Sequence, residues 1–224
     1  MNGTSGSLLD AIADKKVPKL VTDPLTKIFN QQIMRLRGVV HGHTLAKMID
    51  LHDDIINEAT RNSERCDARQ AFPFLPVIPA VSLSKINIML RLAGEVHFPG
   101  RQDASLLGIE SRGVQHKIEM PQTPYYLFDV RCGLGGCDPS QPKLAPLISQ
   151  PDGQYRSQLT VAEVLALAIH FPKDALASPI YATGDVCSGI PLLRFRRKKI
   201  ELVSLPAPAP NDLEPPSVGK IVIC

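Results

Sequence analysis

The sequence predicts a single α+β domain, in which a small mixed or antiparallel sheet packs against helices and follows an N-terminal helical hairpin. Three observations support this fold class. Two come from hydrophobic spacing: helical periodicity between residues 25 and 59, and apolar runs of strand length at Tyr125–Val130 and beyond residue 180. The third is composition, since 224 residues with 44% apolar and 21% charged side chains are typical of one globular core.

The chain is predicted to divide into an N-terminal extension, residues 1–24, and one domain, residues 25–224. Within the domain we expect a helical hairpin (25–65), a sheet-and-helix core (72–205), a proline-rich linker (206–216) and a C-terminal strand (217–224).

Composition also narrows the classes of function. A net charge of +3 is too small to indicate a nucleic-acid-binding protein, and no apolar run reaches the length of a membrane span. Five cysteines without paired short spacings differ from a secreted disulfide framework. We therefore expect a cytoplasmic protein with reduced thiols that binds neither membranes nor nucleic acid.

The predicted helices begin after Thr22-Asp23-Pro24, which is a helix-start signal. One amphipathic helix runs from Leu25 to Leu36, and a second follows Thr44 and ends at Ala59. A third is expected over Ser82–Leu92. A fourth starts at Thr160, which forms a capping box with Glu163, and stops at Pro172.

The predicted strands begin with the proline-interrupted stretch Phe72–Val81, which suits an edge or irregular strand better than a central one. Tyr125–Val130 reads as a buried strand, and Gly133–Pro151 as a loop. Later strand candidates are Ile180–Thr183, Leu192–Arg196, Ile200–Leu205 and Lys220–Ile223.

Several polar clusters are candidates for chemistry. His41, His43 and His52 with Asp53 are ligand types for zinc or iron, but their pattern is not a known site, and helix caps and a satisfied core histidine explain them better. We therefore predict no metal site and no cofactor. Thr183-Gly184-Asp185 has the composition of a turn.

The glycine-rich run Cys132–Cys137 follows a strand, where loops often carry sites. It lacks the spacing of a phosphate-binding loop or of a zinc site, so a flexible turn is the simpler reading. As a nucleophile Cys132 would need a base, for which His116 and His170 are the candidates.

Asp129 lies in an otherwise apolar strand, so an inward-facing carboxylate needs a partner, such as Arg131 or Arg194, or has a perturbed pKa. A strand-end cap or a solvent-facing position would explain it without function. The predicted catalytic candidates are therefore Asp129 and Cys132.

Residues Arg194, Arg196, Arg197, Lys198 and Lys199 form a basic block between two strand candidates. The alternation on either side predicts a hairpin with an exposed basic tip, where charges also protect a sheet edge. An acidic protein partner or phosphate groups could meet this block.

The second half resembles a family of uncharacterised bacterial proteins, largely actinobacterial, that is known only as a domain of unknown function. The landmarks are Pro124–Val130, Leu159–Glu163 and Ala166–Pro172, joined by Phe72–Val81 and Ile190–Leu193, and they cover about two thirds of the chain. The resemblance implies the fold boundaries and carries no activity.

These observations favour a noncatalytic binding or regulatory domain whose N-terminal helices meet a protein partner or a second copy of the chain, with a small-molecule ligand left open. The alternative is a small hydrolase or transferase that uses the loop after Tyr125–Val130, with Asp129 as acid or base and Cys132 as nucleophile.

Overall fold

The computed structural model describes residues 23–65, 71–80, 82–100, 104–109, 114–116, 121–131, 147–149, 155–172, 179–205, 217–218 and 220–223. Its helices are α2 (Pro24–Leu36), α3 (Gly42–Asp50), α4 (His52–Arg65), α5 (Leu83–His97) and α6 (Val161–His170). None of the described helices is long and apolar enough to cross a membrane.

The described strands form three sheets. The largest has the order β1-β4-β11-β6-β5, with β12 also paired to β4; the others are β2-β10-β9-β7 and the short pair β3-β8. The bounds are β1 Ala71–Val77, β2 Ala104–Leu107, β3 Gln115–His116, β4 Tyr125–Arg131, β5 Leu147–Ser149, β6 Tyr155–Gln158, β7 Ile180–Tyr181, β8 Asp185–Val186, β9 Ile190–Arg196, β10 Lys199–Leu205, β11 Ser217–Val218 and β12 Lys220–Ile223. The predicted α+β class is confirmed.

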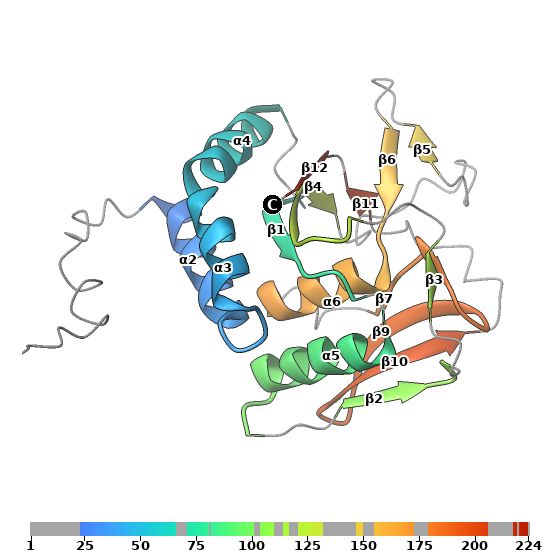
Figure 1. Cartoon of the computed structure of the whole chain (residues 1–224). Coiled ribbons are helices and arrows are strands. Elements are labelled where there is room, and N and C mark those ends of the chain that lie inside the picture. Colours follow the sequence, from blue (N-terminus) through green and yellow to red (C-terminus); the bar gives the residue numbers. More distant parts are fainter. Residues whose placement is uncertain are drawn as a thin grey trace, which may run out of the picture.

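Helices and sheets alternate in layers (Figure 1). Helices α2 and α4 cover one face of β1 and β4, and their shared core, which we call the α2–α4 core, includes Phe29, Leu36, Ile55, Phe74 and Tyr126. Helices α5 and α6 fill the space between the other face of that sheet and the sheet of β9 and β10. Their shared core is the α5–α6 core.

Helix α6 is the centre of the molecule, because all ten of its residues are buried. The spacing of its apolar residues predicts a helix with one inner face, and that expectation is wrong. Sheets lie on two sides of α6 and helix α5 lies on a third, so every face meets protein. The predicted capping box is confirmed at Thr160 and Glu163.

The predicted second helix is two helices. Leu51 separates α3 from α4 with φ −81° and ψ 3°, and its N–H bonds the carbonyl of Ile49. This tighter turn redirects the chain, so the N-terminal layer holds three described helices rather than a hairpin of two. Other corrections are strand β5, which lies within the expected loop Gly133–Pro151, and strand β6, which the sequence did not indicate.

Strand β1 lies at a sheet edge and holds two prolines, as predicted. The hairpin of β9 and β10 and the C-terminal strand β12 are also confirmed. Residues 1–22 and the proline-rich linker, residues 206–216, lie outside the described residues.

The alternation of side chains along β1 and β4 reverses at Asp129. Tyr126 and Phe128 face the α2–α4 core, and strict alternation would send Val130 the same way, yet Val130 lies in the α5–α6 core. Phe72 on β1 makes the same change relative to Phe74. Asp129 causes this reversal because its φ of +50° is left-handed. Such a residue rotates the backbone, so that the side chains after it in β4 point to the opposite face of the sheet from the one that alternation would give.

Candidate functional site

The two predicted catalytic residues have different outcomes. Asp129 is half-buried in β4, with the left-handed backbone described above. Its expected partner Arg194 instead binds Glu201 across the β9–β10 hairpin, with 2.8 Å between Nε and Oε2. Cys132 lies outside the described residues. His170, one of the two proposed bases for Cys132, is buried in α6.

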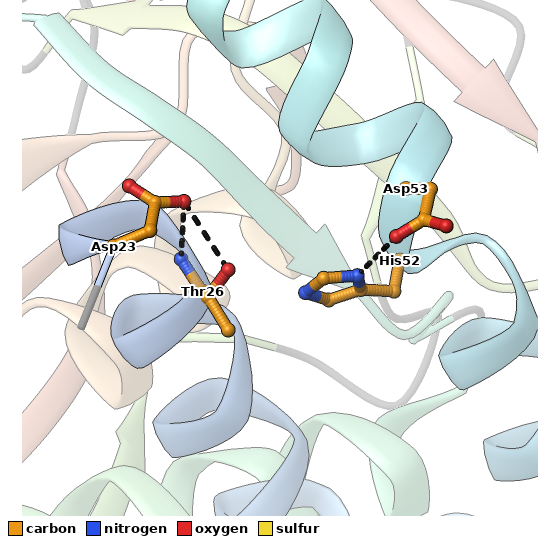
Figure 2. A network of polar contacts seen from close by, with 4 residues as sticks. All are labelled: Asp23, Thr26, His52 and Asp53. Carbon is orange, nitrogen blue, oxygen red and sulfur yellow. Dashed lines mark hydrogen bonds and ion pairs between the residues drawn. The ribbon is translucent and has the colours of Figure 1, made fainter. Parts of the chain in front are cut away.

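The histidine cluster does not form a metal site within the described part of the chain, where no three metal-ligating side chains converge. His41 occupies the N-cap position of α3 and His43 is exposed, while His52 points its ring edge-on to Phe29 at a centroid distance of 4.9 Å. His52 Nδ1 lies 2.7 Å from Asp53 Oδ1, a contact drawn in Figure 2.

The same view shows how helix α2 begins (Figure 2). The Asp23 carboxylate accepts hydrogen bonds from the backbone N–H of Leu25 and of Thr26, each at 3.3 Å, and from the Thr26 hydroxyl at 3.2 Å. This is the helix cap that the sequence signal predicts.

Two carboxylates meet the N-terminus of α6 in the interior. Glu163 Oε2 accepts from the backbone N–H and the hydroxyl of Thr160, at 2.6 and 2.9 Å, and Glu163 Oε1 accepts from the Tyr125 hydroxyl at 3.0 Å. Asp185 Oδ2 accepts from the Val161 N–H at 2.6 Å. A helix N-terminus stabilises negative charge, which suits both side chains.

Burial governs the proton affinity of this network. Loss of solvent raises the pKa of Glu163, and the nearby charge of Asp185 adds to that rise, while the hydrogen bonds from Thr160 and Tyr125 oppose it. Burial and the neighbouring Glu163 also raise the pKa of the Tyr125 hydroxyl. Because Glu163 and Asp185 are at most 1% exposed, a substrate cannot reach them in this conformation. The network therefore joins β4, α6 and the first residue of β8.

Three nitrogenous side chains gather at the other end of α6. Arg35 Nη1 donates to the carbonyls of Ile169 and His170, at 3.0 and 2.6 Å, and His97 Nε2 lies 3.0 Å from the Ala168 carbonyl. A cation at a helix C-terminus is favourable, because Arg35 meets the last carbonyls of the helix.

His170 itself is buried, and no protein group within the described residues hydrogen-bonds either ring nitrogen. Burial, with a further contribution from the Arg35 charge, lowers the pKa of His170 to about 3. Burial likewise lowers the pKa of His97. His170 is therefore neutral at physiological pH and unsuited to carry a charge in this conformation.

The basic hairpin differs from these buried groups because it is open to solvent. Arg196 pairs with Lys199 across the two strands, and all four residues from Arg196 to Lys199 are exposed. Arg197 and Lys198 form the turn itself, with φ of +51° and +62°. Two left-handed central residues define a type I′ hairpin turn, which normally takes Asn and Gly.

Of the groups described here, the sequence indicates the Asp23 cap, the capping box and the basic tip, but not the contacts of Tyr125, Asp185 and Arg35. The composition of Thr183-Gly184-Asp185 predicts a turn, and a turn does form, but the Asp185 carboxylate also caps a helix that begins 24 residues earlier. The strand pattern predicts that Tyr125 belongs to a buried strand, but it does not indicate the hydrogen bond to Glu163. Only the position of a hydroxyl on a strand beside a predicted cap could have indicated that bond.

Comparison of the chain with protein-family models, with curated proteins and with solved structures finds no match.

Proposed function

We propose that this chain is a noncatalytic binding or regulatory domain, and that it recognises an acidic protein partner through the hairpin tip Arg196–Lys199. The observation that carries the proposal is the backbone of the turn. Arg197 and Lys198 are long, β-carbon-bearing residues held at positive φ, a backbone conformation that glycine or asparagine adopts with less strain.

Repulsion between like charges also destabilises the hairpin tip. Arg196 and Lys199 are directly opposed on neighbouring strands, and like charges in that arrangement are destabilising. Within the described residues no carboxylate forms an ion pair with any of the four cations, whereas the nearest other charged cross-strand pair, Arg194 with Glu201, is neutralised. A concentration of strain and charge at an exposed tip is typical of a binding element.

The rest of the hairpin holds the tip in place. Phe195, which precedes Arg196, packs against His97 of α5 with the two rings tilted and their centroids 4.2 Å apart, and Ile200, which follows Lys199, is fully buried. The four cations thus project from a rigid base. Charged side chains on such a base can select an acidic segment and speed its association.

The test is a titration with polyglutamate, a probe for acidic polypeptide, followed by fluorescence anisotropy at low and high salt. The decisive variant is Arg196→Gln with Lys199→Gln, which removes two charges and leaves the left-handed turn residues untouched. We expect affinity to fall by about tenfold, and wild-type affinity to fall with salt.

The matched control is Lys27→Gln with Lys47→Gln, which removes the same charge from exposed positions on α2 and α3. It should bind as the wild type does. Equal losses in both variants would mean that net charge alone attracts the probe, and the proposal would fail.

A cytoplasmic location and reduced thiols are part of the proposal. Cys187 is free, and its thiol lies within hydrogen-bonding distance of the Gly189 carbonyl oxygen and the Ser204 hydroxyl, at 3.3 and 3.1 Å. A thiol with such structural contacts suits a reducing compartment. The relation to the bacterial family of unknown function likewise remains a prediction.

A second candidate is a small hydrolase or transferase that uses Asp129. The observation in its favour is the left-handed backbone of Asp129 in the middle of a strand, since strained residues cluster at active sites. Screening ester and phosphate-ester substrates with the wild type and with Asp129→Asn tests it. Turnover that the substitution abolishes, while the unfolding free energy is retained, would favour the enzyme.

A further inference from the structure

Strand β2 is an edge strand whose outer side pairs with no other described strand. It runs parallel to β10, with Ala104 opposite Ile200 and Leu107 opposite Val203. Its sequence, Ala-Ser-Leu-Leu, holds no charged residue and no proline, the usual means of blocking a sheet edge. The other large sheet, by contrast, ends in β1 with Pro73 and Pro76.

The basic tip lies beside one end of this edge. Lys199 immediately precedes Ile200, the residue opposite Ala104, so the N-terminal end of β2 adjoins the cations. At the other end Leu107 is 45% exposed. Along β2 the available surface therefore changes from cationic to apolar.

The edge is also held rigidly. Ala104 and Leu106 pack on the α5–α6 core, and α5 lies against β2. Gly108, at φ +69°, ends the strand, and its carbonyl accepts a 2.7 Å hydrogen bond from the Ser188 hydroxyl. An edge that is already ordered loses little entropy when another strand adds to it.

We infer that β2 receives an extended segment of an acidic protein partner, which adds as a further strand and places acidic side chains against Arg196–Lys199. The inference rests on the proposed function and adds the conformation of the partner and its position. Backbone hydrogen bonds supply affinity in this mode of recognition, and side-chain pockets and charges supply specificity. Charge complementarity with the tip requires acidic residues at the end of the segment that lies beside Ala104.

The probe is a synthetic peptide of alternating valine and threonine with a run of aspartates at one end, made with the aspartates at the N-terminus or at the C-terminus to allow both strand directions. Hydrogen exchange of the full-length protein is measured with and without it. We expect slower exchange at the amides of β2. We expect no change in β7, the other edge of the same sheet, or in β1, an edge of the largest sheet.

The control peptide has the same sequence with N-methyl groups on alternate backbone nitrogens, in either phase. It keeps every charge and side chain, but its methylated nitrogens cannot donate hydrogen bonds along one edge of the peptide strand. When the methylated nitrogens are those that face β2, we expect the affinity for the protein to fall by about tenfold. Equal affinity for both phases and the parent peptide, or binding without protection of β2, would overturn the inference.

The outcomes separate the inference from the proposed function. If polyglutamate binds at the tip but β2 is not protected by the strand-forming peptide, the inference fails and the proposed function stands. If neither probe responds to Arg196→Gln with Lys199→Gln, both fail. A concentration-dependent dimer with the same protected amides, read by native mass spectrometry, would assign the edge to a second copy and overturn the inference.

Discussion

The hydroxyl of Tyr125 donates a 3.0 Å hydrogen bond to Glu163 Oε1, which joins strand β4 to the first turn of the fully buried helix α6. Next to it, Tyr126 points to the opposite face of the sheet and donates to the Met48 carbonyl at 3.3 Å. Two adjacent tyrosines thus fasten the two helical layers to one strand.

Replacement of the two tyrosines distinguishes these bonds. Tyr125→Phe should lower the free energy of unfolding by about 1–3 kcal/mol, because a buried carboxyl loses one of its three donors. Tyr126→Phe is the matched control and should cost about 1 kcal/mol or less, since a neutral carbonyl accepts its bond. Urea unfolding measures both, and an equal or larger cost for Tyr126→Phe would contradict the role given to Glu163.

Acid should destabilise the fold through His170. The pKa of this side chain falls from 6.5 to about 3 on folding, so between those pH values the unfolded chain binds a proton that the folded chain does not. Its contribution to stability is complete above pH 6.5 and declines as the pH falls, by about 1.4 kcal/mol per pH unit. His170→Leu should remove this slope.

The measurement is urea unfolding of wild type and His170→Leu at several pH values from neutral to mildly acidic. Glu163 acts in the opposite sense, because its raised pKa favours the folded state at low pH, but it is present in both proteins and cancels in the difference. His43→Gln, on an exposed residue, should keep the wild-type slope. Parallel curves for wild type and His170→Leu would refute the assignment.

The left-handed backbone of Asp129 can be measured with two substitutions that both remove its carboxylate. At φ +50° glycine is unstrained and alanine is not, so Asp129→Gly should be more stable than Asp129→Ala by about 1 kcal/mol. The comparison isolates the backbone, because the side-chain contacts are lost in both. Greater stability of the alanine variant would argue against a left-handed residue here.

The hairpin turn should gain stability when its charges are removed. Arg197→Asn with Lys198→Gly installs the residues that a type I′ turn prefers, so we expect the free energy of unfolding to rise by about 1–2 kcal/mol. Binding of polyglutamate should weaken in the same variant. Arg197→Lys with Lys198→Arg keeps both charge and strain and should change neither property. A loss of stability in the asparagine and glycine variant would show that the turn is not strained.

Gly189 tests how closely the loop between β8 and β9 packs against the end of β10. A β-carbon on Gly189 would overlap the backbone carbonyl of Leu205, so Gly189→Ala should cost about 3 kcal/mol or more. Gly38→Ala is the control, since no heavy atom lies within 4 Å of the added carbon. Thermal unfolding reads both, and a small effect at Gly189 would mean that the chain is not so close there.

Features set by neighbours in sequence could be predicted from sequence. The capping box of Thr160 and Glu163, the cap at Asp23, the edge position of the proline-containing strand and the basic hairpin each depend on residues a few positions apart. Their signals are local, so one chain is enough to find them.

Features that depend on contacts between distant parts of the chain could not be predicted from the sequence. Leu51 continues the apolar spacing of a helix, yet the chain turns there to pack α3 and α4 on the sheet. Asp129 reads as one polar residue in a strand, yet it reverses the alternation, and Pro73 lies opposite it where no strand hydrogen bond is donated. Whether Asp185 caps α6 depends on which strand the fold brings beside it.

By itself, then, the sequence determined the α+β class, most of the element positions and the basic tip, because periodicity, caps and charge runs are properties of short segments. Only the tertiary structure decided that α6 is enclosed on all sides, that Tyr125 and Asp185 meet its first turn, and that the edge of β2 lies beside the cations. The physical reason is that burial and strand order arise from contacts between segments that no local pattern records.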